Sequence, residues 1–145
     1  SRPLDPSWPE VGPVVGPPSQ TRVTGELAFA GAGVTPADVD VVSLHDMCAS
    51  EEITSLVALG LATDDDVVDL ATSGGLTHTG RLPTNTDGGC IARGHPIGAT
   101  GLAQAAEIVV QLRRTAGERQ VADASVGLVQ AAGGGGSCAV AILTR

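Results

Sequence analysis

The chain has almost no aromatic side chains, and this limits what its core can be made of. Trp8 and Phe29 are the only aromatic residues among 145. A core without large rings must be built from closely packed Ala, Val, Leu and Ile, and the 20 glycines let backbones approach one another or a ligand. The hydrophobic fraction of 42% is sufficient for such a core, so we expect one folded domain rather than a disordered chain.

The charge of the chain argues against a polyanion as its partner. The chain has sixteen acidic and eight basic residues, so its net charge is −8, and all eight basic residues are arginines. Nucleic acid and anionic membranes require clustered cations. We also find no apolar run that could span a bilayer and no charged-then-apolar leader. We therefore expect a cytoplasmic protein with no nucleic-acid partner and no membrane span.

The three cysteines, Cys48, Cys90 and Cys138, form an odd set without a Cys-x-x-Cys pair. Neither a disulfide framework nor a thiolate zinc site is indicated by this spacing. The sequence thus predicts free thiols in a reducing compartment and no metal site.

Two regions differ in composition. Residues 1–20 hold six of the nine prolines, which predicts an extended segment or linker without a helix. Residues 21–145 show the patterns of one α/β domain. Hydrophobic periodicity predicts helices over 21–30, 50–59, 64–70 and 102–112, and strands over 39–44, 126–129 and 138–143. This order predicts a mixed sheet covered by helices.

Residues 71–101 are predicted to form a long structured loop, which in a compact domain is usually functional. Five glycines lie between positions 88 and 101, and His95 stands just before a helix whose first amides are free. An imidazole beside backbone donors suits an oxyanion hole or acid–base chemistry on a carbonyl compound. The segment lacks the Walker lysine, so a nucleotide phosphate loop is disfavoured.

Three motifs, in order, resemble the thiolase superfamily. Residues 94–101, Gly-His-Pro-Ile-Gly-Ala-Thr-Gly, are similar to the thiolase signature. Residues 44–48, Leu-His-Asp-Met-Cys, follow a strand where thiolases carry Asn-Glu-Ala-Phe, and resemble the sterol-carrier-protein-x and lipid-transfer branch. Residues 127–137 resemble the closing glycine-rich hairpin of the family.

The resemblance covers about residues 21–145 and implies an incomplete thiolase-like carboxy-terminal domain. Such enzymes use a coenzyme A thioester as substrate, without a bound cofactor, and assemble as homo-oligomers. Their acyl-accepting cysteine belongs to the amino-terminal half, which would be supplied by the same or another chain. We therefore expect acyl-CoA as a ligand, and we do not expect this chain alone to complete a reaction.

The resemblance also assigns candidate site residues. His95 matches the histidine that helps activate the nucleophilic cysteine and bind the thioester oxygen, and His45 takes the place of an asparagine that holds a catalytic water. Both are the expected catalytic residues. Substrate contacts are expected from Asn85, Gly94, Gly98, Gly133, Gly134 and Gly135. Asp46, which we expect to orient loops, is a further candidate, as are Cys90 and Cys138; the alternative for Cys90, as for Cys48, is a small buried side chain.

One departure from the family leaves the chemistry open. Classical thiolases carry Cys-x-Gly before the final strand, whereas alignment on the glycines places Ala132 there. The leading interpretation is an acyl-CoA C-acyltransferase of the lipid-transfer type. The alternatives are a retro-aldolase of a β-hydroxyacyl-CoA, of the steroid side-chain type with an OB-fold partner, and a non-catalytic acyl-CoA-binding or assembly module.

Overall fold

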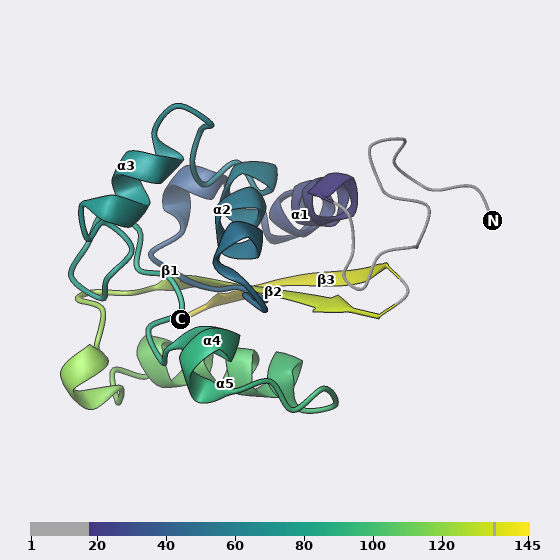
Figure 1. Ribbon diagram of the computed structural model, residues 1–145. Helices are drawn as coiled ribbons and strands as arrows, with labels where there is room; N and C mark the ends of the chain where they lie inside the picture. The colour runs from purple at the N-terminus through teal and green to yellow at the C-terminus, as the bar shows by residue number, and fades with distance from the viewer. Residues whose placement is uncertain (1–17, 135) are drawn as a thin grey trace.

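A computed structural model describes residues 18–134 and 136–145 and shows a sheet between two layers of helices (Figure 1). The elements follow in the order α1 (Pro18–Ala32), the 3₁₀ turn η1 (Pro36–Asp38), β1 (Val41–Ser43), α2 (Ala49–Ala58), α3 (Val67–Thr72), α4 (Gly89–Arg93), α5 (Thr100–Leu112), the 3₁₀ turn η2 (Gly117–Arg119), β2 (Val126–Gly133) and β3 (Ser137–Thr144). Helices α1, α2 and α3 lie on one face of the sheet, and α4 and α5 lie on the other.

The sheet is mixed, as the sequence predicts. β2 is central, with β1 parallel to it and β3 antiparallel to it. Val42 pairs with Leu128 in the parallel ladder, and Thr84 forms a bridge to Val42 on the other edge of β1. The segment before α4 is thereby tied to the strand whose end carries His45.

The alternation of side chains along β1 and β2 creates two separate cores. Val42 and Leu128 face α1 and α2, where Phe29 and Leu56 are buried with them. Residues of the opposite parity face α5; this second core contains Val41, Val129, Ile108, Leu112, Val121 and Ala124. Both faces of the two strands are therefore covered, which explains their continuous apolar character.

The approach of α5 to the sheet depends on one glycine. A Cβ atom at Gly127 would lie near Ile108 Cγ2, and Ile108 has no exposed surface. Because isoleucine is β-branched and stiff, this contact could not be relieved without moving the helix. Gly127 thus sets the distance between the sheet and the helix that follows the His95 loop.

The helix α1 begins earlier than the proline content suggests. The expectation of a segment without helix over 1–20 is wrong for residues 18–20, because the helix begins at Pro18. Proline is tolerated in the first helical turn, where its missing N–H would have no intrahelical partner. The rest of that predicted segment, residues 1–17, lies outside the described part of the chain.

The predicted loop over 71–101 is interrupted by helix at three points. α3 continues to Thr72, α4 spans Gly89–Arg93, and α5 already begins at Thr100. α4 is too short to be stable from local propensity. Similarly, α2 begins at Ala49 with Cys48 in the N-cap position, one residue before the expected Ser50. The strands predicted over 126–129 and 138–143 lengthen to Val126–Gly133 and Ser137–Thr144, because each supplies the other's hydrogen-bonding partners. The strand predicted over 39–44 is shorter, Val41–Ser43.

Candidate functional site

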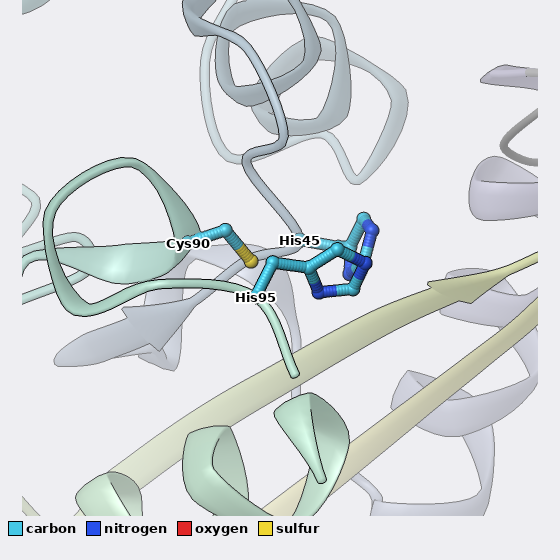
Figure 2. Close-up of side chains that lie close together, drawn as sticks. All are labelled: His45, Cys90 and His95. Carbon is cyan, nitrogen blue, oxygen red and sulfur yellow. The ribbon is translucent and has the colours of Figure 1, made fainter. Parts of the chain in front are cut away.

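The fold brings His45, Cys90 and His95 together from three segments (Figure 2). His45 follows β1, Cys90 lies on α4, and His95 lies in the loop between α4 and α5. The two imidazole rings meet edge to face, with centroids 4.8 Å apart and planes at 85°. One donor atom from each of the three side chains lies within 4.8 Å of the other two. This cluster is the candidate site, and its donor set is also one that could hold a metal ion.

Buried amides hold the end of β1 in place. The backbone N–H of His45 donates to Gln130 Oε1 at 3.0 Å, and the preceding N–H of Leu44 donates to Asn85 Oδ1 at 2.8 Å. The backbone of Gln130 is itself held, because its main-chain carbonyl oxygen accepts a hydrogen bond from Gln104 Nε2 at 2.9 Å. Since His45 is only 4% exposed, its ring has little freedom to leave the cluster.

The orientation of the His95 ring is set by the first residue of α5. His95 Nδ1 lies 2.7 Å from Thr100 Oγ1, and that hydroxyl donates to the Pro96 carbonyl at 3.2 Å. When the hydroxyl donates its proton to Pro96, it accepts from Nδ1–H of His95. In that tautomer the lone pair of the ring lies on Nε2, where it is available for proton transfer or a ligand.

Asp46 joins the His45 segment to α4. Its Oδ1 accepts a hydrogen bond of 2.6 Å from the backbone N–H of Cys90, and the carboxylate is almost completely buried. Gly89 permits this contact, because it adopts a positive φ of 60° and a Cβ atom there would overlap the Asp46 carboxylate. α4, and with it Cys90, is therefore positioned by a tertiary contact.

Burial shapes the protonation of the cluster. Desolvation lowers the pKa of His45, the neighbouring His95 lowers it further, and Asp46 opposes the shift. Burial raises the pKa of the Cys90 thiol, and the charge of Asp46 adds to this. At neutral pH the site therefore presents a neutral His45 and a protonated thiol, which is a weak nucleophile until it loses its proton.

The other predicted site residues occupy different positions around the cluster. Asn85 has a positive φ of 48° and uses its oxygen on Leu44, so it holds the end of β1. Gly94 and Gly98 have open space where a Cβ would lie. Gly94 also has a φ of 97°, a conformation that favours glycine. These two glycines leave backbone accessible beside His95.

Among the described residues, the closing hairpin contributes no donor atom to the cluster. Cys138 pairs across the sheet with Ala132, and its Sγ lies 3.6 Å from Thr21 Oγ1 and 3.8 Å from Gln130 Nε2. Its described contacts therefore lie toward α1. Gly133 ends β2, Gly134 begins the turn, and Gly135 lies outside the described residues.

Sequence reasoning missed Gln130 and Thr100. Gln130 is 2% exposed in the middle of an apolar strand, where an unpaired amide would be costly. A lone glutamine within an otherwise apolar strand pattern was the available signal. Thr100 belongs to the 94–101 motif, and its role follows from standing one helical turn after Pro96.

The molecule is thus a three-layer α/β domain in which two histidines meet near the end of the first strand. A family model described as "Thiolase C-terminal domain-like" matches residues 15–145, and the chain belongs to this family.

Two curated relatives and one solved structure show how the chain compares. It is 43% identical to sterol carrier protein 2 of Gallus gallus over 122 residues, covering 84% of this chain and 22% of that protein. It is 44% identical over 119 residues to an acetyl-CoA acetyltransferase of Methanothermobacter thermautotrophicus, covering 81% of this chain and 31% of that protein. The solved structure, titled "Ltp2-ChsH2(DUF35) aldolase", superimposes with a TM-score of 0.76 at 29% identity, covering 86% of this chain and 31% of that one.

The chain thus spans between about a fifth and a third of the length of these relatives. Within residues 18–134 and 136–145, no helix combines the length and apolar character that a bilayer span requires.

Proposed function

We propose that this chain is the carboxy-terminal part of a thiolase-like acyl-CoA enzyme that forms or cleaves a carbon–carbon bond next to a coenzyme A thioester. The observation that carries the proposal is the edge-to-face pair of His45 and His95, with ring centroids 4.8 Å apart. Bond formation or cleavage beside a thioester passes through an enolate, whose oxygen requires hydrogen-bond donors and whose carbon requires a proton donor or acceptor. Two adjacent imidazoles can meet both needs.

The two histidines have different roles in this proposal. His95 Nε2 is oriented by the Thr100 contact at Nδ1 and acts as the acid–base group. His45 is buried and neutral, and a neutral imidazole can donate one N–H to the thioester oxygen as negative charge develops there. The open backbone at Gly94 and Gly98 leaves room for the substrate beside His95.

The proposal assigns the remaining parts of the enzyme to other segments. The acyl-accepting cysteine and the other half of the substrate site would come from an amino-terminal half, in the same or another polypeptide. The name of one relative, an acetyl-CoA acetyltransferase, supports acyl-CoA as the ligand. The chain covers 31% of that relative, which leaves room for an amino-terminal half. We further propose a homo-oligomer and coenzyme A as part of the substrate.

A second candidate, retro-aldol cleavage of a β-hydroxyacyl-CoA, is favoured by the closing hairpin. Ala132 supplies no thiol where classical thiolases carry their second cysteine, and the Sγ of its partner Cys138 contacts Thr21 and Gln130. In this reaction a base removes the β-hydroxyl proton, the Cα–Cβ bond breaks, and the electron pair becomes the enolate of the shortened acyl-CoA. The enolate carbon then takes a proton, and a carbonyl compound leaves. The solved neighbour is titled an aldolase with a DUF35 component, which supports a partner protein of that kind for this alternative.

The experiment is an assay of the full-length protein, with and without a DUF35 partner, on two substrates. Thiolysis of a β-ketoacyl-CoA requires free coenzyme A, whereas cleavage of a β-hydroxyacyl-CoA does not, so the coenzyme A dependence separates the two reactions. We expect His95→Ala to lower turnover by about 10²-fold or more, in keeping with loss of a general acid–base group. His78→Ala is the matched control, because it removes a histidine outside the cluster. Equal turnover in both variants would contradict the mechanism. It would favour a non-catalytic, acyl-CoA-binding role for this part of the full-length protein.

A further inference from the structure

We propose that His45, Cys90 and His95 form a binding site for a borderline transition-metal ion of the zinc class, with three protein ligands and one open coordination position. Two imidazoles and one thiolate are the ligands that Zn²⁺ prefers, and three protein ligands with a fourth open position is the arrangement of accessible zinc sites. The sequence predicts no metal site, because its cysteines form no Cys-x-x-Cys pair, and the three donors meet only in the folded chain.

The distances allow the site to close with small side-chain movements. Zinc holds nitrogen at about 2.0–2.1 Å and sulfur at about 2.3 Å, so tetrahedral ligand atoms lie roughly 3.3–3.8 Å from one another. The three donor atoms here all lie within 4.8 Å of one another. Figure 2 shows the Cys90 sulfur pointing toward His95, whose ring lies against that of His45. Side-chain rotations that move the donor atoms by about an ångström would bring them into coordination range.

Each histidine offers one ring nitrogen that has no hydrogen-bond partner among the described residues. His45 Nδ1 is buried and has no hydrogen-bond partner in the part of the chain that the structure describes. A buried, unpartnered nitrogen costs free energy, and a metal ion would relieve that cost. His95 is bound through Nδ1 to Thr100, which leaves Nε2 as its donor. A hydrogen bond at the far ring nitrogen is the usual support of a histidine ligand.

Binding of the ion displaces the thiol proton of Cys90. The S–H bond breaks, the sulfur–metal bond forms, and the proton passes to solvent. The carboxylate of Asp46 accepts a hydrogen bond from the Cys90 backbone, so its negative charge lies close to the incoming cation.

A bound ion would occupy both imidazoles, so that metal and thioester would exclude each other. This consequence rests on the proposed function, whereas the binding of the ion does not. A protein that binds zinc as described but turns over no acyl-CoA would retain the metal site and lose the proposed function. An enzyme that turns over acyl-CoA but does not bind zinc would retain the proposed function and lose the metal site.

The test is a titration of the full chain with Zn²⁺ against a chromophoric chelator, followed by Co²⁺ as a spectroscopic probe. We expect one ion per chain and a thiolate-to-cobalt charge-transfer band. Cys90→Ser should weaken Zn²⁺ binding by at least about tenfold and abolish the band. Cys48→Ser, Cys138→Ser and His78→Ala should change neither, because those residues lie outside the cluster.

Two results would overturn the site. The first is unchanged zinc affinity in Cys90→Ser, and the second is a wild-type cobalt spectrum without a thiolate band. The second result needs no variant, so it decides the question even if Cys90→Ser does not fold. Circular dichroism of each variant separates loss of fold from loss of ligand.

Discussion

The Asp46 carboxylate and the Cys90 backbone N–H are joined by a hydrogen bond of 2.6 Å that links the end of β1 to the start of α4. The same link sets where the chain continues toward His95, five residues later. Without it, the five-residue helix α4 would have little reason to form. The distance between the two imidazoles therefore depends on a carboxylate that need not touch the substrate.

Replacing Asp46 tests this positioning role. We expect Asp46→Ala to lower the free energy of unfolding by about 1–3 kcal/mol, because it leaves the buried Cys90 N–H without its acceptor. Asp46→Asn retains an oxygen acceptor and should cost less. Urea denaturation followed by circular dichroism measures both. Equal losses would mean that the charge, rather than the hydrogen bond, matters.

Gly89 should tolerate no side chain. Its φ of 60° and the overlap of a Cβ with the Asp46 carboxylate act together. Gly33 has a φ of 69° with no atom near its Cβ position, so Gly33→Ala carries the backbone strain alone, about 1–2 kcal/mol. We expect Gly89→Ala to lower the free energy of unfolding more than Gly33→Ala does. Urea denaturation of the pair would contradict the overlap if both variants lost the same amount.

His45 should titrate below the ordinary histidine value of 6.5, because burial disfavours its cation and His95 adds to the effect. Proton NMR of the ring resonances against pH measures the midpoint. His95→Gln removes the second cause, so the pKa of His45 should rise in that variant. His78→Gln is the control and should leave it unchanged. A midpoint at or above 6.5 in the wild type would contradict the burial of the ring.

Glu52 should make stability depend on pH. Burial raises its pKa from 4.5 to about 7, and the nearby charge of Asp46 contributes. Because the folded state holds the proton more tightly than the unfolded state, ionised Glu52 costs stability above pH 7, and that cost is removed as pH falls from about 7 toward 4.5. Glu52→Gln should therefore be more stable than the wild type at pH 8.

The measurement for Glu52 is the difference in unfolding free energy between wild type and Glu52→Gln at pH 8, 6 and 5. We expect the advantage of the variant to shrink as the pH falls. A difference that stays constant over this range would mean that Glu52 ionises with its ordinary pKa.

The sequence by itself determined the fold class and the candidate histidines. Helical spacing and β-branched runs are local patterns, and they place Val41 and Val42 on opposite faces of a strand whatever the rest of the chain does. The glycine-rich signature at 94–101 marks His95 for the same reason, since its elements are adjacent in the chain. The start of α1 at Pro18 was missed because a proline-rich composition does not show which proline occupies a first turn.

Only the tertiary structure decided how those residues meet. The contact of His45 with His95 and the bond from Asp46 to Cys90 join segments far apart in sequence, and no local pattern encodes such a distance. The support of His45 by Gln130 depends on β1 pairing with β2, which is also non-local. The physical reason is that a buried polar group must find a partner, and the folded chain, rather than the neighbouring residues, determines which one lies within reach.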